Sequence, residues 1–359
     1  MARAKNLRAP YRTAATDRAP RIDQKGAKFV ILGHWLLIET LDVPPTWSVL
    51  AVDTAPRRWK SLARTVPSRL MPILTAAAAS GGTVERQLPK SRHAWSGYRA
   101  RAIALTGPDE RVHAVQMWVG PGDPPAPPPV ATHLLDAHTR RTEVRSAGLG
   151  PAFDRKRSVW IGAESFEHVE RFDDALDLAA IVARAAPGSR WCGDICVRTP
   201  DGLRTLMMAT RNSASDPYLW RGILADVTES VPPQPKSFEA VTVETLVGRN
   251  PGMYLAVVDT ERVRVIRWIS PPVPGLDWSG DTDERTLPHP GDRERITAAR
   301  TAIRAGAPSW TLPNLRLADT AGGWITVDVE VSPLPHGPDG TGTPHFALAR
   351  IDLREAGTR

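Results

Sequence analysis

A chain of 359 residues with 42% hydrophobic and 24% charged residues has the composition of a globular protein with two or three domains. The sequence contains no apolar run of the roughly 20 residues that a membrane-spanning helix needs. The formal net charge of +7 is concentrated in residues 1–28, where eight Lys and Arg face two Asp, so the rest of the chain carries only about +1.

Residues 1–28 form a basic tail. Such a tail can bind polyanions without sequence specificity, and an Arg-rich, acid-poor leader can also be a transit peptide. The polar composition is more typical of a disordered extension, and the tail lacks the apolar segment of a secretory signal. We therefore expect a disordered tail, no specific nucleic-acid partner and no membrane span.

Two cysteines, Cys192 and Cys196, are too few for a disulfide framework and fit a reducing cytoplasm. Four residues apart on one strand, their Cα atoms would lie about 13 Å apart, beyond the roughly 4.4–6.8 Å of a disulfide. Alternation places them on one strand face with Arg190, Asp194 and Arg198, which predicts a solvated face. A metal site there would need further ligands from elsewhere, and we expect none.

The remaining chain predicts the same order of elements three times: a hairpin, a helix and a three-strand meander. In the first unit, residues 30–120, we expect a hairpin (34–41 and 47–53), a loop or short helix (57–61), a helix (67–80) and strands (83–88, 98–105 and 112–119). Residues 120–129 (GPGDPPAPPP) read as a stiff linker.

The second unit, residues 130–231, begins with a weaker hairpin (133–136 and 142–146). Apolar residues at three- and four-residue spacing predict a long helix over 164–186, followed by three strands within 191–230. The third unit, residues 237–355, predicts a short helix (237–247), a hairpin (254–258 and 262–269), a helix (293–304) and strands (310–317, 324–331 and 346–352). The predicted class is α+β, with three five-stranded antiparallel sheets, each with helices on one face.

Several motifs resemble those of PAS domains. They are WSG at 278–280, HPGDR at 289–293, VRTPDG at 197–202 and GILADVTE at 222–229. As a whole, the chain resembles stand-alone tandem sensor proteins of the PAS–GAF–PAS family; whether its middle unit is GAF or PAS stays open. The resemblance implies a sensor that binds a small molecule or regulatory protein partners, with a homodimer left open. The alternative is a purely structural interaction scaffold whose cavities are filled by its own side chains.

No enzyme motif is present: GxSxG, HExxH and the Walker glycine loop are all missing. We therefore expect no enzymatic activity and no required cofactor. Flavin photochemistry would need a reactive cysteine on a helix, which the predicted elements do not provide. His289 could bind haem, but the HPGDR segment is more typical of a helix start with Asp292 as its cap.

The candidate ligand-binding residues all belong to the third unit. Arg267 alternates with Val263, Val265 and Ile269, so it is predicted on an apolar strand face, where an unpaired guanidinium is costly. An anionic ligand, an internal carboxylate or a bulge that turns the side chain outward would each resolve this. Aromatic walls suit planar ligands, although tryptophan also packs in cores. We therefore hypothesise a ligand-binding site formed by Arg267, Trp268, Trp278, His289 and Trp310.

Overall fold

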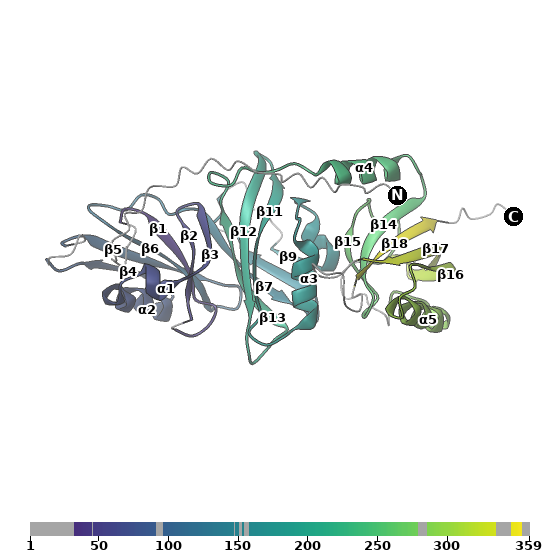
Figure 1. Cartoon of the computed structure of the whole chain (residues 1–359), viewed down its shortest axis with the longest axis horizontal. Helices are drawn as coiled ribbons and strands as arrows, with labels where there is room; N and C mark the ends of the chain where they lie inside the picture. The colour runs from purple at the N-terminus through teal and green to yellow at the C-terminus, as the bar shows by residue number, and fades with distance from the viewer. Residues whose placement is uncertain are drawn as a thin grey trace, which may run out of the picture.

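The structure is a computed structural model that describes residues 32–44, 46–90, 96–146, 148–150, 153, 158–278, 286–334 and 346–353. The basic tail predicted at 1–28 lies outside the described residues. The strands form three antiparallel sheets that follow one another along the long axis of the molecule, with short helices between and beside them (Figure 1). The predicted α+β class is confirmed. Within these described residues the sheets contain six, seven and five strands, so the prediction of five strands is confirmed for the third unit and wrong for the first two.

The first sheet has the order β3-β2-β1-β6-β5-β4, and helix α2 packs on one of its faces. Gly81 ends α2 in the left-handed conformation, as the sequence pattern predicts. The loop or short helix expected at 57–61 is instead an edge strand, because its backbone pairs with β2 after positive φ angles at Arg58 and Trp59. The elements are β1 (Trp35–Glu39), β2 (Ser48–Val52), β3 (Ala55–Ser61), α1 (Leu62–Thr65), 3₁₀ helix η1 (Ser68–Leu70), α2 (Met71–Ser80), β4 (Thr83–Gln87), β5 (Arg99–Thr106) and β6 (Val112–Gly120).

The second sheet has the order β10-β11-β12-β13-β7-β8-β9. The predicted meander forms the long strands β11 to β13, and Thr199 and Gly202 pair at the first turn. The elements are β7 (Val130–Asp136), β8 (Arg141–Arg145), β9 (Val159–Ile161), 3₁₀ helix η3 (Gly162–Phe166), β10 (Val169–Arg171), α3 (Ala175–Arg184), β11 (Arg190–Thr199), β12 (Gly202–Asn212) and β13 (Leu219–Asp226).

The long helix predicted over 164–186 is wrong, because only Ala175–Arg184 is α-helical. Its expected first half forms η3 and strand β10, which pairs with the outer edge of β11 and so satisfies backbone groups that the edge would leave open. Phe172 packs edge-on against Trp191, with ring centroids 5.6 Å apart. The apolar residues of this segment do pack against the second sheet, but they do so from a 3₁₀ helix, a short strand and a short α-helix and not from one long helix.

The third sheet has the order β15-β14-β18-β17-β16, and helix α5 packs on one face. Ser237 caps α4 by accepting a hydrogen bond from the backbone N–H of Ala240. The predicted hairpin, helix and three strands are confirmed. The elements are α4 (Phe238–Gly248), β14 (Met253–Asp259), β15 (Arg264–Trp268), 3₁₀ helix η4 (Pro290–Asp292), α5 (Arg293–Arg304), β16 (Trp310–Ala318), β17 (Trp324–Pro333) and β18 (Phe346–Leu353).

The three units share one strand connection. In each, the last strand of the meander returns to pair with the first strand of the hairpin: β6 with β1, β13 with β7 and β18 with β14. The threefold order of elements seen in the sequence is therefore a repeat in three dimensions.

The first and second sheets pack face to face, with α2 and α3 on the two outer sides (Figure 1). Their shared apolar cluster joins Leu37, Leu50 and Ala114 of the first unit to Met207 and Ile223 of the second. Strands β1 and β2 are consequently buried on both faces along their whole length.

The same packing corrects the face predicted for the two cysteines. Cys192 lies against the cluster shared by the two sheets, and Cys196 is buried and accepts a hydrogen bond from the backbone N–H of Gln234 at 3.3 Å. Arg58 of β3 binds Asp194 between the two cysteines at 2.7 Å, while Arg190 and Arg198 at the two ends of this face are exposed. Burial raises the pKa of the Cys192 thiol to about 11. The two cysteines do lie on one strand face, as alternation predicted, but protein and not solvent lies against them.

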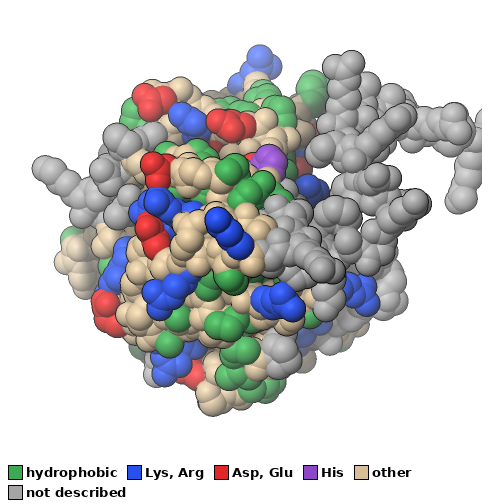
Figure 2. All heavy atoms as spheres, turned by 90° about the vertical axis from the view of Figure 1, so that its left-hand side faces the viewer, with side chains coloured by type: hydrophobic (Ala, Val, Ile, Leu, Met, Phe, Trp, Pro, Cys, Tyr) green, Lys and Arg blue, Asp and Glu red, His purple; other side chains and the backbone are tan. Residues whose placement is uncertain are grey.

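The outer end of the first unit mixes Lys and Arg with Asp, Glu and hydrophobic side chains (Figure 2). Opposite charges interleave on this face, unlike the single-sign stripe of a nucleic-acid interface. Among the described residues, no helix is both long enough and apolar enough to cross a membrane.

Candidate ligand-binding cavity

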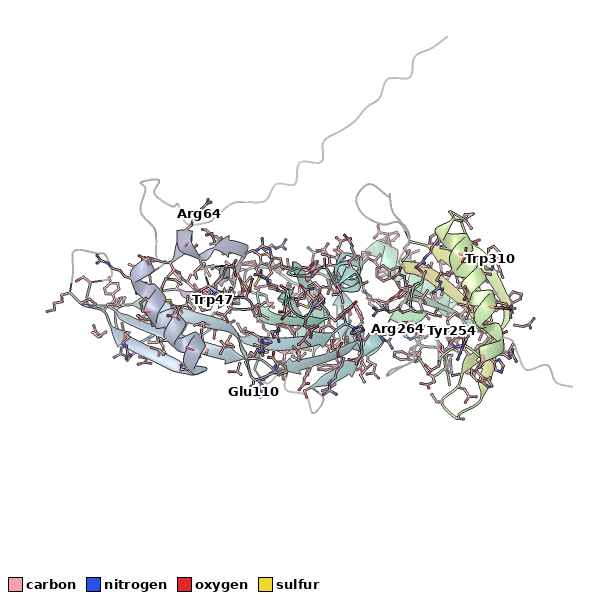
Figure 3. The ribbon with its side chains drawn as sticks, turned by 90° about the horizontal axis from the view of Figure 1, so that it is seen from below. Trp47, Arg64, Glu110, Tyr254, Arg264 and Trp310 are labelled. Atoms are coloured by element: carbon pink, nitrogen blue, oxygen red, sulfur yellow. The ribbon has the colours of Figure 1, made fainter. Side chains whose placement is uncertain are left out.

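Three of the five residues predicted as a ligand site lie together, but not inside a domain. Arg267, Trp268 and Trp278 line an open groove of about 1350 Å³ between the second and third units. His289 and Trp310 are not part of this groove. Trp310 lies toward the outer end of the third unit and is 38% exposed (Figure 3).

Arg267 does not share the face of Val265. Residues Val257 and Val258 pair with Arg267 and Val265 respectively, so one extra residue of β15 lies between them and the strand bulges. The bulge turns the guanidinium toward the second unit, where its carbon lies 5.5 Å from the centre of the Phe166 ring. Burial lowers the pKa of Arg267, and the negative charge of Glu244 opposes that shift. The prediction that Arg267 lies on the apolar strand face is thus wrong. Of the three explanations that the sequence allowed, the structure shows the bulge.

The two tryptophans of the groove also serve the core. Trp268 and Trp278 meet edge to face, with centroids 5.9 Å apart, and both pack against buried residues of the third unit. This contact packs both rings into the core, and Nε1 of Trp268 has no hydrogen-bond partner among the described residues.

The HPGDR segment begins a helix, as predicted, but its polar groups act differently from expectation. His289, not Asp292, makes the capping bond: its Nδ1 accepts the N–H of Gly291 at 3.0 Å. Asp292 instead accepts from the backbone and side chain of Arg316 and from Arg295, and the Arg316 hydrogen bond lowers the pKa of Asp292 to about 2. The His289 ring packs edge-on against Trp324.

The cavity between helix and sheet in the third unit is small. It measures about 110 Å³ and is lined mainly by aliphatic side chains, including Ile303 of α5 and Leu312 of β16. None of the five predicted residues lines it.

The second unit contains a larger cavity, of about 330 Å³, between its sheet and the segment formed by η3, β10 and α3. Its walls are largely apolar and include Phe153, Phe172, Leu178, Ile195 and Met208. The helix explains the space. No residue of α3 is fully buried, and the short side chains of Ala179 and Ala183 line the cavity.

The buried polar residues in this largely apolar wall are His133, Thr210 and Asp259, among the described residues. His133 of β7 lines the cavity and is only 3% exposed. Its ring lies over Gly222 of β13, where a Cβ atom would stand 2.0 Å from Cε1 of His133. Nδ1 of His133 has no hydrogen-bond partner among the described residues. Burial, and secondarily the charge of His113, lower the pKa of His133 to about 3, so its ring is neutral at physiological pH.

The hydroxyl groups of Thr142, Ser165 and Thr210 in the cavity wall have partners within the protein. Thr210 donates to the carbonyl of Arg221 at 3.1 Å, and Ser165 donates to the hydroxyl of Thr142 at 3.2 Å. A polar atom without such a partner is costly when buried. His133 is therefore the distinctive chemical feature of this cavity.

The third unit closes one side of the cavity with charged residues. Arg264 of β15 reaches across to donate to the carbonyl of His138 at 3.0 Å, and Arg262 contributes to the same rim. Figure 3 places Arg264 where the third unit meets the second. Arg140 of the second unit, which donates to the carbonyl of Val265 at 3.4 Å, completes a basic rim around an apolar interior.

Two models of known protein families match separate stretches of the chain. Residues 34–129 match the family described as "Rv3651-like, N-terminal", and residues 242–341 match "Rv3651-like, C-terminal domain". The chain is thus similar to Rv3651-like proteins over these two stretches. The segment between the two Rv3651-like matches holds most of the second unit, including His133. The family matches thus name Rv3651-like domains and not the PAS–GAF–PAS family that the motifs resemble.

A solved structure shares the fold of this chain. A putative uncharacterized protein from Mycobacterium tuberculosis is 19% identical, with a TM-score of 0.68 over 90% of this chain and 97% of that one. The PAS-B domain of Drosophila melanogaster Cycle is 10% identical, with a TM-score of 0.25 over 28% of this chain and 99% of that one. A PAS domain from Colwellia psychrerythraea is 16% identical, with a TM-score of 0.25 over 32% and 96%. No curated protein matches the chain.

Proposed function

We propose that this chain is a non-enzymatic sensor built from PAS- or GAF-type units, and that its second unit binds a small apolar molecule. The single observation that carries the proposal is the cavity of about 330 Å³ between the second sheet and α3. Ligand sites are typically apolar cavities of roughly 300–1,000 Å³ with a few placed polar groups. The repeated strand connection and the motifs at 197–202 and 289–293 support the PAS-type assignment.

The alternative is an interaction scaffold whose cavities are filled by its own side chains. The third unit favours it locally, since its interior space is only about 110 Å³. The second unit favours a ligand. The choice between the two functions therefore depends on the second cavity.

Titration of the purified chain with naphthalene, followed by ligand-observed NMR, tests the proposal. Ala179→Phe fills the cavity from α3 and should abolish binding; Leu176→Phe, at a position on the same helix that is 37% exposed and outside the cavity lining, is the matched control. Binding that Ala179→Phe abolishes and Leu176→Phe preserves supports the sensor. Absence of binding to wild type, with Ala179→Phe more stable, supports the scaffold.

A further inference from the structure

We propose that the cavity of the second unit selects an uncharged, mainly apolar molecule that carries a hydroxyl group, and that His133 binds this hydroxyl. The inference rests on the proposed function and specifies its ligand. The cavity wall is largely apolar, and yet it contains His133, whose Nδ1 has no hydrogen-bond partner among the described residues.

The position of His133 is set by the sheet. Ala131, His133 and Leu135 alternate along β7 and face the same side. Opposite His133 lies Gly222, and only a residue without a side chain leaves room for the ring there. The backbone therefore holds the imidazole against the sheet, where it forms part of the cavity wall.

The chemistry of the ring favours a neutral ligand group. A neutral imidazole carries one N–H donor and one bare acceptor nitrogen. A hydroxyl both donates and accepts, so it can pair with a ring nitrogen of His133 in either tautomer of the ring. A carboxylate would bring an uncompensated charge beside apolar side chains such as Phe172 and Met208, which is unfavourable.

The basic rim offers a competing arrangement. A carboxylate ligand could leave its charge between Arg140 and Arg264 and extend only its apolar body into the cavity. Both guanidinium groups already donate to carbonyls across the junction of the two units. We therefore assign the rim to the contact between units, and the experiment below distinguishes the two arrangements.

The experiment compares three probes of one shape: naphthalene, 1-naphthol and 1-naphthoate. Wild-type protein is expected to bind 1-naphthol about tenfold more tightly than naphthalene, the gain of roughly one added hydrogen bond to a buried partner. His133→Phe keeps a flat ring over Gly222 and removes both nitrogens, so it should bind the two probes equally. His138→Phe makes the same chemical change outside the cavity lining and should keep the preference.

A second measurement needs no variant. The ¹⁵N chemical shift of the His133 ring should move when 1-naphthol is added to wild type and should not move with naphthalene. Equal affinity of wild type for the two probes, a preference that survives in His133→Phe, or tightest binding of 1-naphthoate would each overturn the hydroxyl assignment while leaving the cavity as a ligand site. Failure of all three probes to bind would instead overturn the proposed function and this inference together.

Discussion

Arg221 of the second unit donates from Nε to Oδ2 of Asp109 in the first unit at 2.6 Å, and their side chains are 11% and 15% exposed. The same carboxylate accepts a hydrogen bond from Nε2 of His113 at 2.9 Å. His113 is fully buried and its Nδ1 lies 3.2 Å from the carbonyl oxygen of Gly222. The glycine that supports His133 on the cavity side is thus contacted by the first unit on the other side.

Removing the cation from this pair should destabilise the contact between the first two units. Arg221→Met leaves the carboxylate of Asp109 partly buried with one partner fewer, and the free energy of unfolding should fall by about 2–4 kcal/mol. Chemical denaturation of the single variants and of Arg221→Met with Asp109→Asn measures the coupling. Additive effects of the two substitutions would contradict a direct pair.

The pair also predicts a dependence of stability on acid. Burial raises the pKa of Asp109, but hydrogen bonds from His113 and Arg221 outweigh it and hold that pKa well below its usual range. A depressed folded-state pKa contributes stability above the unfolded-state value of about 3.9, and this stability is lost as pH falls further. The melting temperature of wild type should therefore exceed that of Asp109→Asn near neutral pH, and this difference should shrink progressively below about pH 4. Thermal unfolding at a series of pH values measures it. A constant difference between the two proteins down to pH 2 would argue against the assignment.

Gly222 should not tolerate even one added methyl group. In Gly222→Ala the Cβ would stand 2.0 Å from Cε1 of His133 and 2.6 Å from the carbonyl oxygen of Ala209. Overpacking of this kind costs about 1–3 kcal/mol. Gly248→Ala in α4 is the control, because nothing lies within 4 Å of the added atom and alanine favours a helix. Equal melting temperatures for the two variants would contradict the close packing of His133.

Arg267→Met should change stability by no more than about 1 kcal/mol. Its guanidinium contacts the face of Phe166 across the groove, a type of interaction worth roughly 0.5–1 kcal/mol at a partly exposed site. The substitution keeps the apolar stem of the side chain. A thermal-shift screen of acidic metabolites on wild type and variant completes the test. A shift seen only with wild type would restore the anion site that the sequence suggested.

Cleavage in residues 121–129 should not release the first unit. That segment lacks strand and helix, but Trp35 donates to the carbonyl of Pro125 at 3.0 Å, and the first two sheets share an apolar cluster. After limited proteolysis, the two fragments should elute together from a size-exclusion column and separate only in denaturant. Separation under native conditions would show that the shared cluster contributes little.

Local patterns were sufficient to predict the repeat. Alternation and turn residues placed the meander of β11 to β13, and spacing and glycine stops placed α2 and α5, because backbone preferences and one-sided burial act within a few residues. The assignments that the structure overturned are 57–61 and 164–186. In both, the backbone pairs with an exposed strand edge that is created by residues distant in the sequence.

The candidate site could not be predicted in full from the sequence, because contacts between the units help to form it. A β-strand pattern does not say whether its second face meets solvent or another sheet, so Cys192 and Cys196 were placed in water when β3 and residue Gln234 cover them. A bulge of one residue reversed the face of Arg267 and moved it from a cavity to a groove. His133 could have been found from its place between Ala131 and Leu135, a polar residue on an apolar face. Its lack of a partner, and the cavity beside it, follow only from how the sheet, α3 and the third unit pack together, because unfilled volume is a property of the assembled side chains and not of any one segment.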